Sequence, residues 1–152
     1  YDLLGKNGLI DNIFINEIIP KLQNHINNIL GFISDFTINV VYNKGTIQIY
    51  KNVGGKQINL MSTSGYEKFI MNIVFRLAML DLNSNFKADF FIIDEGFSYC
   101  DSENLDKLKV LFEYLRKKFK WSLIVSHLEE VKGNFDKEIQ IQILDKESHI
   151  FV

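Results

Sequence analysis

Apolar residues recur every three or four positions in three long stretches of the chain. This spacing places them on one face of an α-helix, so we predict amphipathic helices over about 16–33, 66–82 and 102–119. Pro20 would fall in or near the first turn of the first helix, where a missing N–H costs little, whereas a helix that began earlier would be kinked there. The first helix is expected to bury Ile15, Ile18, Ile19, Leu22, Ile26, Ile29, Leu30 and Ile33.

Shorter β-prone runs lie between the first two helices and at the end of the chain. Runs at 36–42, 46–51 and 56–61 are separated by Asn- and Gly-containing turns, which predicts an antiparallel meander. The last part of the chain, 138–152, is expected to form a closing hairpin with its turn at 145–148.

Two continuous apolar runs, 89–94 and 121–126, lie before and after the third predicted helix. Runs of this kind are typical of strands buried on both faces of a parallel sheet. Strand, helix and strand in just over thirty residues predict a right-handed βαβ crossover. The expected fold class is therefore α/β: a parallel sheet with a βαβ crossover, together with antiparallel strands and flanking helices.

Composition narrows the class of protein further. Hydrophobic residues make up 47% and charged residues 24% of the 152 residues, as in a folded globular domain, and we expect one domain over 1–152. The 17 basic and 19 acidic side chains give a net charge of −2, which excludes a strongly basic nucleic-acid module but leaves room for a local basic patch. The lone Cys100 excludes an internal disulfide, and no metal-ligand spacing predicts structural zinc.

Targeting signals are not expected. No apolar run approaches the roughly 20 residues that a membrane span needs, and the start lacks the layout of a signal peptide. We therefore expect no membrane partner and a protein that is not secreted, located in the cytoplasm or wherever the genome is replicated. The chain begins at Tyr1 rather than Met, so we expect a segment of a longer polypeptide.

Three places carry candidate chemistry. Asp94 and Glu95 end a predicted parallel strand, the edge where open α/β sheets bind ligands, although a charged pair can also simply end a strand in solvent. Ser64 stands where a loop enters the second helix, which suits either an anion site or a plain N-cap. His127 follows the next parallel strand, where an isolated histidine can also be a structural residue.

Taken in order, four segments resemble the C-terminal lobe of an ABC-type ATPase, in particular the SMC-like DNA-repair ATPases of the SbcC type. Gly65 precedes Asp94 by 29 residues and His127 follows it by 33, which is similar to the family's spacing. Asp94-Glu95-Gly96-Phe97 resembles the family's Asp-Glu-Gly-Phe-Gly. The segments resembling the signature, Walker B, the D-loop and the switch-histidine loop are Ser64-Gly65-Tyr66-Glu67-Lys68, Phe91-Ile92-Ile93-Asp94-Glu95, Ser98-Tyr99-Cys100-Asp101 and Ser126-His127.

The resemblance implies a role for each segment in ATP hydrolysis. Asp94 would hold Mg²⁺ through water, Glu95 would orient or deprotonate the attacking water, and His127 would contact the γ-phosphate. The signature residues Ser64, Gly65, Tyr66 and Glu67 would bind the ATP held by a second copy of the head, and the D-loop residues Ser98 and Asp101 would cross the same interface.

Two residues depart from the family pattern. Tyr66 replaces the second glycine of the signature, and Ser98 replaces the glycine of the D-loop. Both positions lie where the partner's nucleotide would approach, so the Tyr66 ring is expected either to hold the two heads apart or to make a different contact there.

The chain contains no phosphate-binding loop. The pattern G-x-x-x-x-G-K-[ST] is absent, since Gly55-Lys56 is followed by Gln57 and Tyr50 occupies the place of the first glycine. In the SbcC-type family this Walker A loop lies in an N-terminal lobe, which a long coiled coil separates from the C-terminal lobe in sequence. The resemblance therefore implies an N-terminal lobe of the same polypeptide as partner, with residues 1–15 as the junction to the coiled coil and with no activity for this segment alone.

The resemblance also implies double-stranded DNA and an SbcD-type metallo-nuclease as partners. Lys117, Lys118 and Lys120 form the only basic cluster and are candidates for DNA phosphate contacts, although cations at a helix end also suit the helix dipole. Two other functions remain open: an ABC-type head in chromosome organisation or recombination-protein loading without a nuclease, and a non-catalytic interaction domain. Glu95 argues against the second, because decayed ATPases often lose this acid.

Overall fold

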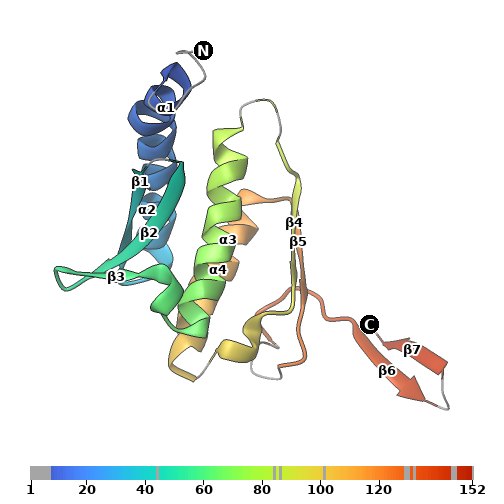
Figure 1. Ribbon diagram of the computed structural model, residues 1–152. Helices are drawn as coiled ribbons and strands as arrows, with labels where there is room; N and C mark the ends of the chain where they lie inside the picture. The colour runs from blue at the N-terminus through green and yellow to red at the C-terminus, as the bar shows by residue number, and fades with distance from the viewer. Residues whose placement is uncertain are drawn as a thin grey trace.

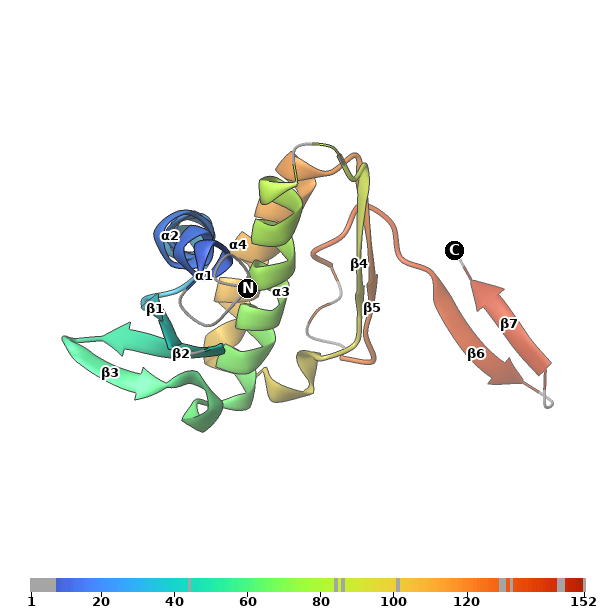
Figure 2. The same ribbon diagram turned by 45° about the horizontal axis from the view of Figure 1, so that its top comes forward.

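The computed structural model describes residues 8–43, 45–83, 85, 87–100, 102–128, 131, 133–144 and 147–151. A long helical segment and an antiparallel sheet form one side of the molecule, and a parallel strand pair with two helices forms the other (Figure 1). A hairpin projects beyond the strand pair at the C-terminal end (Figure 2). The result is a mixed α/β fold with separate parallel and antiparallel sheets, which agrees with the fold class expected from the pattern.

The first helical segment begins earlier than predicted. It runs without interruption through α1 (Leu9–Ile13), the π-helical η1 (Phe14–Ile18) and α2 (Ile19–Ile33). Pro20 lies near the start of α2, directly after the π-helical turn. Proline cannot donate the usual backbone bond and its ring crowds the carbonyl four residues earlier, and the wider π-helical turn relieves this within a continuous helix.

The register shift at η1 changes which residues are buried. Ile15 and Ile18, predicted as core residues, are exposed, whereas α2 buries its apolar face as expected. The shift arises because a π-helical turn holds more residues than an α-helical turn and so rotates the apolar face. In α1, which precedes the π-helical turn, Asp11 Oδ1 accepts a 2.7 Å hydrogen bond from the hydroxyl of Tyr42. This hydrogen bond to a carboxylate raises the pKa of Tyr42.

The antiparallel meander is confirmed, with strands β1 (Thr37–Asn43), β2 (Thr46–Val53) and β3 (Lys56–Asn59) in that order. Val53 pairs with Lys56, so Gly54 and Gly55 form a two-residue turn. Both glycines have positive φ (55° and 77°), as the tight turns that suit the twist of a hairpin require. The sheet packs against α2, and the Asn27 side chain bonds both the N–H and the C=O of Ile38.

The βαβ unit is also confirmed. Helix α3 (Gly65–Leu82) leads to β4 (Phe90–Asp94), then α4 (Ser102–Lys118) and β5 (Trp121–Val125), and β4 pairs with β5 in parallel. The second and third helices therefore lie within one or two residues of the positions predicted for them. Helices α3 and α4 pack on one side of the strand pair (Figure 2), and Phe91 and Ile93 are buried on that side.

The prediction that both faces of the parallel strands are buried is wrong within this chain. The second face of β4 and β5 is apolar but exposed. Phe90 and Trp121 stack on it with their ring centroids 4.7 Å apart. An apolar run predicts burial but not the element that provides it, and the described helices cover one face only. The exposed apolar residues of this open face are Phe90, Ile92, Trp121, Leu123 and Val125.

The closing hairpin consists of β6 (Gln140–Leu144) and β7 (Glu147–Phe151). Glu147 and Ser148, predicted as turn residues, are paired in β7 with Leu144 and Ile143. Every described residue of the two strands is exposed, including the isoleucines. No described helix is long and apolar enough to cross a membrane.

Candidate nucleotide-hydrolysis site

The candidate residues come together at one end of the molecule. The N-terminus of α3, the carboxyl ends of β4 and β5 and the short 3₁₀ helix η3 (Phe97–Tyr99) lie at the lower end in Figure 1. This arrangement follows from topology, because the carboxyl ends of two parallel strands share an edge and the helix that precedes β4 runs antiparallel to it. The start of α3 and the end of β5, about sixty positions apart in sequence, thus lie at the same end of the molecule.

Glu95 and His127 face each other at this edge. His127 Nδ1 lies 3.6 Å from Glu95 Oε1, and both side chains are about three-fifths exposed. Asp94, the last residue of β4, alternates with the buried Ile93 and so points to the open apolar face of the strand pair. The Oγ of Ser126 accepts the N–H of Leu128 at 3.1 Å.

A left-handed turn sets the position of the Glu95 carboxylate. Glu95 has φ 54°, the only positive φ of a non-glycine residue in the described part of the chain, and Gly96 follows with φ 97°. The N–H of Glu95 donates a 2.9 Å hydrogen bond to the carbonyl of Val125, one position beyond the strand ladder. A left-handed residue with a side chain costs roughly 1–2 kcal/mol, and such strain persists only where the surroundings hold it.

Ser64 begins α3 with a capping box. Its Oγ accepts the N–H of Glu67 at 3.2 Å, while the Glu67 carboxylate accepts the N–H of Ser64 at 3.2 Å. The same carboxylate forms an ion pair with Lys51 of β2, in which the lysine side chain is 12% and the glutamate side chain 21% exposed. Glu67 is therefore engaged within its own lobe, and it fixes the N-terminus of the helix to the antiparallel sheet.

The side chain of Tyr66 does not lie where the sequence suggested. Tyr66 is 6% exposed and belongs to the hydrophobic core, so its ring does not project from the N-terminus of α3 as the expectation required. Tyr99 of η3 takes the place beside the helix N-terminus instead. A Cβ at Gly65 would lie 2.5 Å from Cδ1 of the Tyr99 ring, so only glycine fits at position 65 with Tyr99 in this place.

The D-loop prediction is only partly covered by the described residues. Ser98 lies in η3, directly after the acid pair, and Asp101 lies outside the described residues. Sequence reasoning did not find Lys51 or the contact of Tyr99 with Gly65. No local signal marks either, because both contacts join segments that only the fold brings together.

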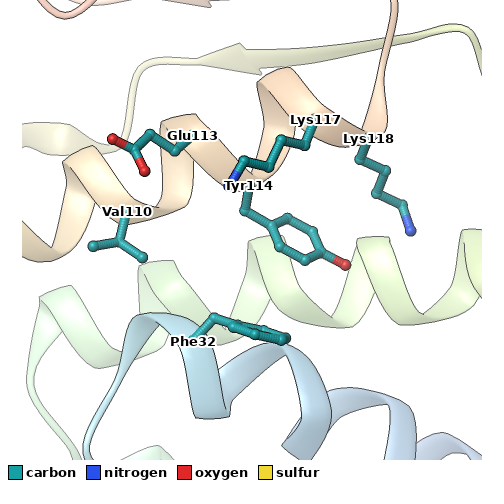
Figure 3. Close-up of a pocket in the computed structure, with 6 residues that line it drawn as sticks. All are labelled: Phe32, Val110, Glu113, Tyr114, Lys117 and Lys118. Atoms are coloured by element: carbon teal, nitrogen blue, oxygen red, sulfur yellow. The ribbon is translucent and has the colours of Figure 1, made fainter.

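The lysine cluster lies at the opposite end of the strand pair. Lys118 forms an ion pair with Asp81, and Lys120 Nζ lies 2.8 Å from Asp89 Oδ2. Lys117 and Lys118 line a groove of about 360 Å³ between α4 and α2, in which Phe32 faces Tyr114 (Figure 3). Two of the three lysines thus have carboxylate partners, and none lies near Glu95.

The donor set at the acid pair suits Mg²⁺ bound together with phosphate. No group of three or more His, Cys, Asp or Glu side chains able to hold a metal occurs among the described residues. Mg²⁺ in phosphoryl-transfer sites takes one or two carboxylates and completes its shell with water and phosphate oxygens. Asp94, at the end of β4, can supply such a carboxylate.

Comparison with curated proteins identifies the relatives of this chain, although no family model matches it. An uncharacterized protein of Acanthamoeba polyphaga mimivirus is 29% identical over 140 residues, which is 81% of this chain and 10% of that protein. The DNA double-strand break repair Rad50 ATPase of Saccharolobus solfataricus is 29% identical over 143 residues, or 93% of this chain and 16% of that protein. The SbcC component of the nuclease SbcCD of Bacillus subtilis is 28% identical over 89 residues, or 57% of this chain and 8% of that protein.

Solved structures share the fold. A chain from work on ATP-driven dimerization and DNA-stimulated activation of SMC ATPases matches with a TM-score of 0.76 at 18% identity, covering 92% of this chain and 87% of that one. The SMC head domain of Thermotoga maritima matches with a TM-score of 0.63 at 20% identity, covering 94% and 50%.

The chain spans less than a fifth of the curated relatives that it matches. The chain is therefore homologous to the Rad50/SbcC ATPases over most of its length, has the fold of SMC head domains and is part of an SMC-like ABC ATPase head.

Proposed function

We propose that this chain is the C-terminal half of an ATP-hydrolysing head that pairs with a second copy of itself when ATP is bound. In the assembled protein, this pairing controls the processing of DNA ends by a metallo-nuclease partner during double-strand-break repair. Relatives named for double-strand break repair and for the nuclease SbcCD support this function. The proposed protein acts on double-stranded DNA inside the cell.

The observation that carries the proposal is the meeting of three functional segments at one end of the lobe. Glu95 and His127 lie 3.6 Å apart, and the capped N-terminus of α3 lies at the same end. Phosphoryl transfer depends mainly on positioning and on neutralising charge, and a carboxylate, an imidazole and a helix N-terminus can each contribute to this.

Each residue has a defined task in this proposal. Glu95 orients or deprotonates the attacking water, and His127 contacts the γ-phosphate. Asp94 holds Mg²⁺, which when bound neutralises charge on the phosphates. Ser64 and the N–H groups after Gly65 bind the γ-phosphate of the ATP carried by the other copy. Ser98 and Asp101 cross the same interface.

The N-terminal lobe of the same polypeptide is proposed to bring the phosphate-binding loop and to cover the open apolar face. Phe90, Ile92 and Trp121 expose an apolar surface on the side that also carries Asp94. Burial of such a surface contributes roughly 25 cal/mol per Å². A lobe that covers this face therefore also brings its own groups close to Asp94.

Replacement of the proposed catalytic carboxylate in the complete head tests the proposal. Glu95→Gln keeps the shape of the side chain and removes the charge that orients water. We expect hydrolysis to fall at least a hundredfold while ATP-dependent pairing of the heads, measured by sedimentation, is preserved or strengthened. Unchanged hydrolysis, or loss of ATP binding, would contradict the role of Glu95.

A head that organises chromosomes without a nuclease is the second candidate. The fold match to the Smc head of Pyrococcus furiosus bound to the C-terminal domain of ScpA, with a TM-score of 0.70 and 18% identity, favours it. Purification of the complete protein from its own source separates the two functions. A co-purifying metal-dependent nuclease supports repair, and a co-purifying winged-helix protein supports chromosome organisation.

A further inference from the structure

The left-handed turn at Glu95 and Gly96 is held by an aromatic ring from another element. Phe69, on α3, packs against Gly96 so closely that a Cβ at Gly96 would lie 2.6 Å from Cε2 of the ring. Gly96 has φ 97°, a conformation that favours glycine. The ring therefore occupies the space that any other residue at position 96 would need.

The Phe69 ring is itself fixed by the core. It meets Phe97 edge to face, with centroids 5.0 Å apart, and Phe97 meets Phe112 of α4 at 6.0 Å in the same manner. Phe97 is 2% exposed, so its position is set by packing on all sides. Phe97, which directly follows the turn, is thus held in place by the core, and the Phe69 ring of α3 packs against the turn itself.

We infer that Phe69 is a positioning residue for ATP hydrolysis. Its ring keeps Gly96 and, through it, Glu95 in the left-handed turn that places the Glu95 carboxylate 3.6 Å from His127. This inference rests on the proposed role of Glu95 as the residue that activates water. In this inference Phe69 acts through the turn and is not itself a catalytic residue.

Phe69→Leu in the complete head tests this role. A branched aliphatic side chain offers no flat face to Gly96, so the turn can relax and Glu95 can leave its strained conformation. We expect kcat for ATP hydrolysis to fall at least tenfold, while KM for ATP and ATP-dependent pairing of the heads stay within twofold of wild type. A variant that only loosens the fold would change KM and pairing as well.

Phe75→Leu is the matched control, because Phe75 lies on the same helix and is exposed. If Phe69→Leu and Phe75→Leu give the same kcat while Glu95→Gln abolishes hydrolysis, the inference is overturned and the proposed function stands. If Glu95→Gln leaves hydrolysis unchanged, the proposed function itself fails. Phe69→Met, of similar volume but without a flat ring, is used if the leucine variant unfolds; unfolding of both would assign Phe69 to stability alone and also overturn the inference.

Discussion

Glu95 combines the proposed catalytic carboxylate with a backbone conformation that suits glycine. Its φ is 54°, and in this conformation its N–H donates a hydrogen bond to the carbonyl of Val125 while the Phe69 ring packs on Gly96. The positive φ of Glu95 is observed in the structure, and the proposed roles of Glu95 and the neighbouring His127 would explain why this strained conformation is kept. The carboxylate is thus positioned at the expense of local stability.

A comparison of Glu95→Gly with Glu95→Ala measures that strain in the complete head. Alanine keeps the penalty of roughly 1–2 kcal/mol for a left-handed conformation, whereas glycine removes this penalty. Glycine also lowers the stability by about 0.4–1 kcal/mol, because it has greater conformational freedom in the unfolded chain. We expect the glycine variant to be more stable than the alanine variant by about 1 kcal/mol in urea unfolding. A more stable alanine variant would show that the turn is not left-handed in solution.

Ser64 gives the sharpest test of contact between two copies. Ser64→Arg should leave each head able to bind ATP, because the phosphate cradle is proposed to lie in the N-terminal lobe, yet it should prevent pairing. Sedimentation with a non-hydrolysable ATP analogue measures the pairing. Normal dimerisation of this variant would refute the assignment of the segment as a signature.

A mixing experiment tests the same contact through activity. One head that carries only Ser64→Arg and one that carries only a broken phosphate loop are combined. In the proposed pair, each ATP site combines the phosphate loop of one head with the Ser64 segment of the other head. Both substitutions therefore affect the same ATP site, and the second ATP site is intact. We expect hydrolysis to return in the mixture and to be absent from either variant alone.

At the scale of secondary-structure elements, Lys51 and Glu67 tie α3 to the antiparallel sheet. The pair is largely removed from solvent, and Lys51 also lies over the Phe36 ring with Nζ 5.1 Å from its centroid. Since Glu67 caps the helix at the same time, the sheet and the helix N-terminus form one unit. The position of Ser64 therefore depends on β2 as well as on its own helix.

Lys51→Met should destabilise the complete head, because methionine keeps the apolar stem but leaves the Glu67 carboxylate without its cation. We expect a loss of about 1–3 kcal/mol in the free energy of unfolding. Lys21→Met is the control, since Lys21 and Glu17 form an exposed helical pair whose loss should cost less than about 0.5 kcal/mol. Equal urea midpoints for the two variants would show that the Lys51 pair contributes nothing.

At the scale of the whole molecule, the apolar surfaces that remain open are large. They include one face of β4 and β5 and the isoleucines of the β6–β7 hairpin. Contiguous exposed apolar surface of this kind is typical of an interaction site. Asp94 lies on the same face of β4 as one such surface, so an element that covers this surface would also lie beside Asp94.

The chain by itself should bind Mg-ATP no more tightly than about millimolar, a binding free energy near ~−4 kcal/mol. It lacks the backbone loop that cradles the phosphates, and its helix N-terminus is proposed to act on the nucleotide of the other copy. Calorimetric titration of the isolated chain measures this affinity. Micromolar binding would indicate a phosphate site that the sequence motifs do not reveal.

Local patterns in the sequence predicted α3, α4, the antiparallel meander and the parallel strand pair. The periodicity over 66–82 predicted α3, and the turn expected at 52–55 predicted the meander, although Asn52 and Val53 belong to β2 and only Gly54 and Gly55 form the turn. The acid pair and His127 were found because the carboxyl ends of parallel strands must share an edge.

Tertiary structure decided how these segments are held. The buried ring of Tyr66, the left-handed turn at Glu95, the Phe69 ring on Gly96 and the ion pair of Lys51 with Glu67 each depend on packing between elements. Phe69 and Gly96 are 27 positions apart, and no periodicity specifies which residue of a helix face meets which turn. The physical reason is that close packing is set by the shapes of all neighbours together, and local sequence does not encode it.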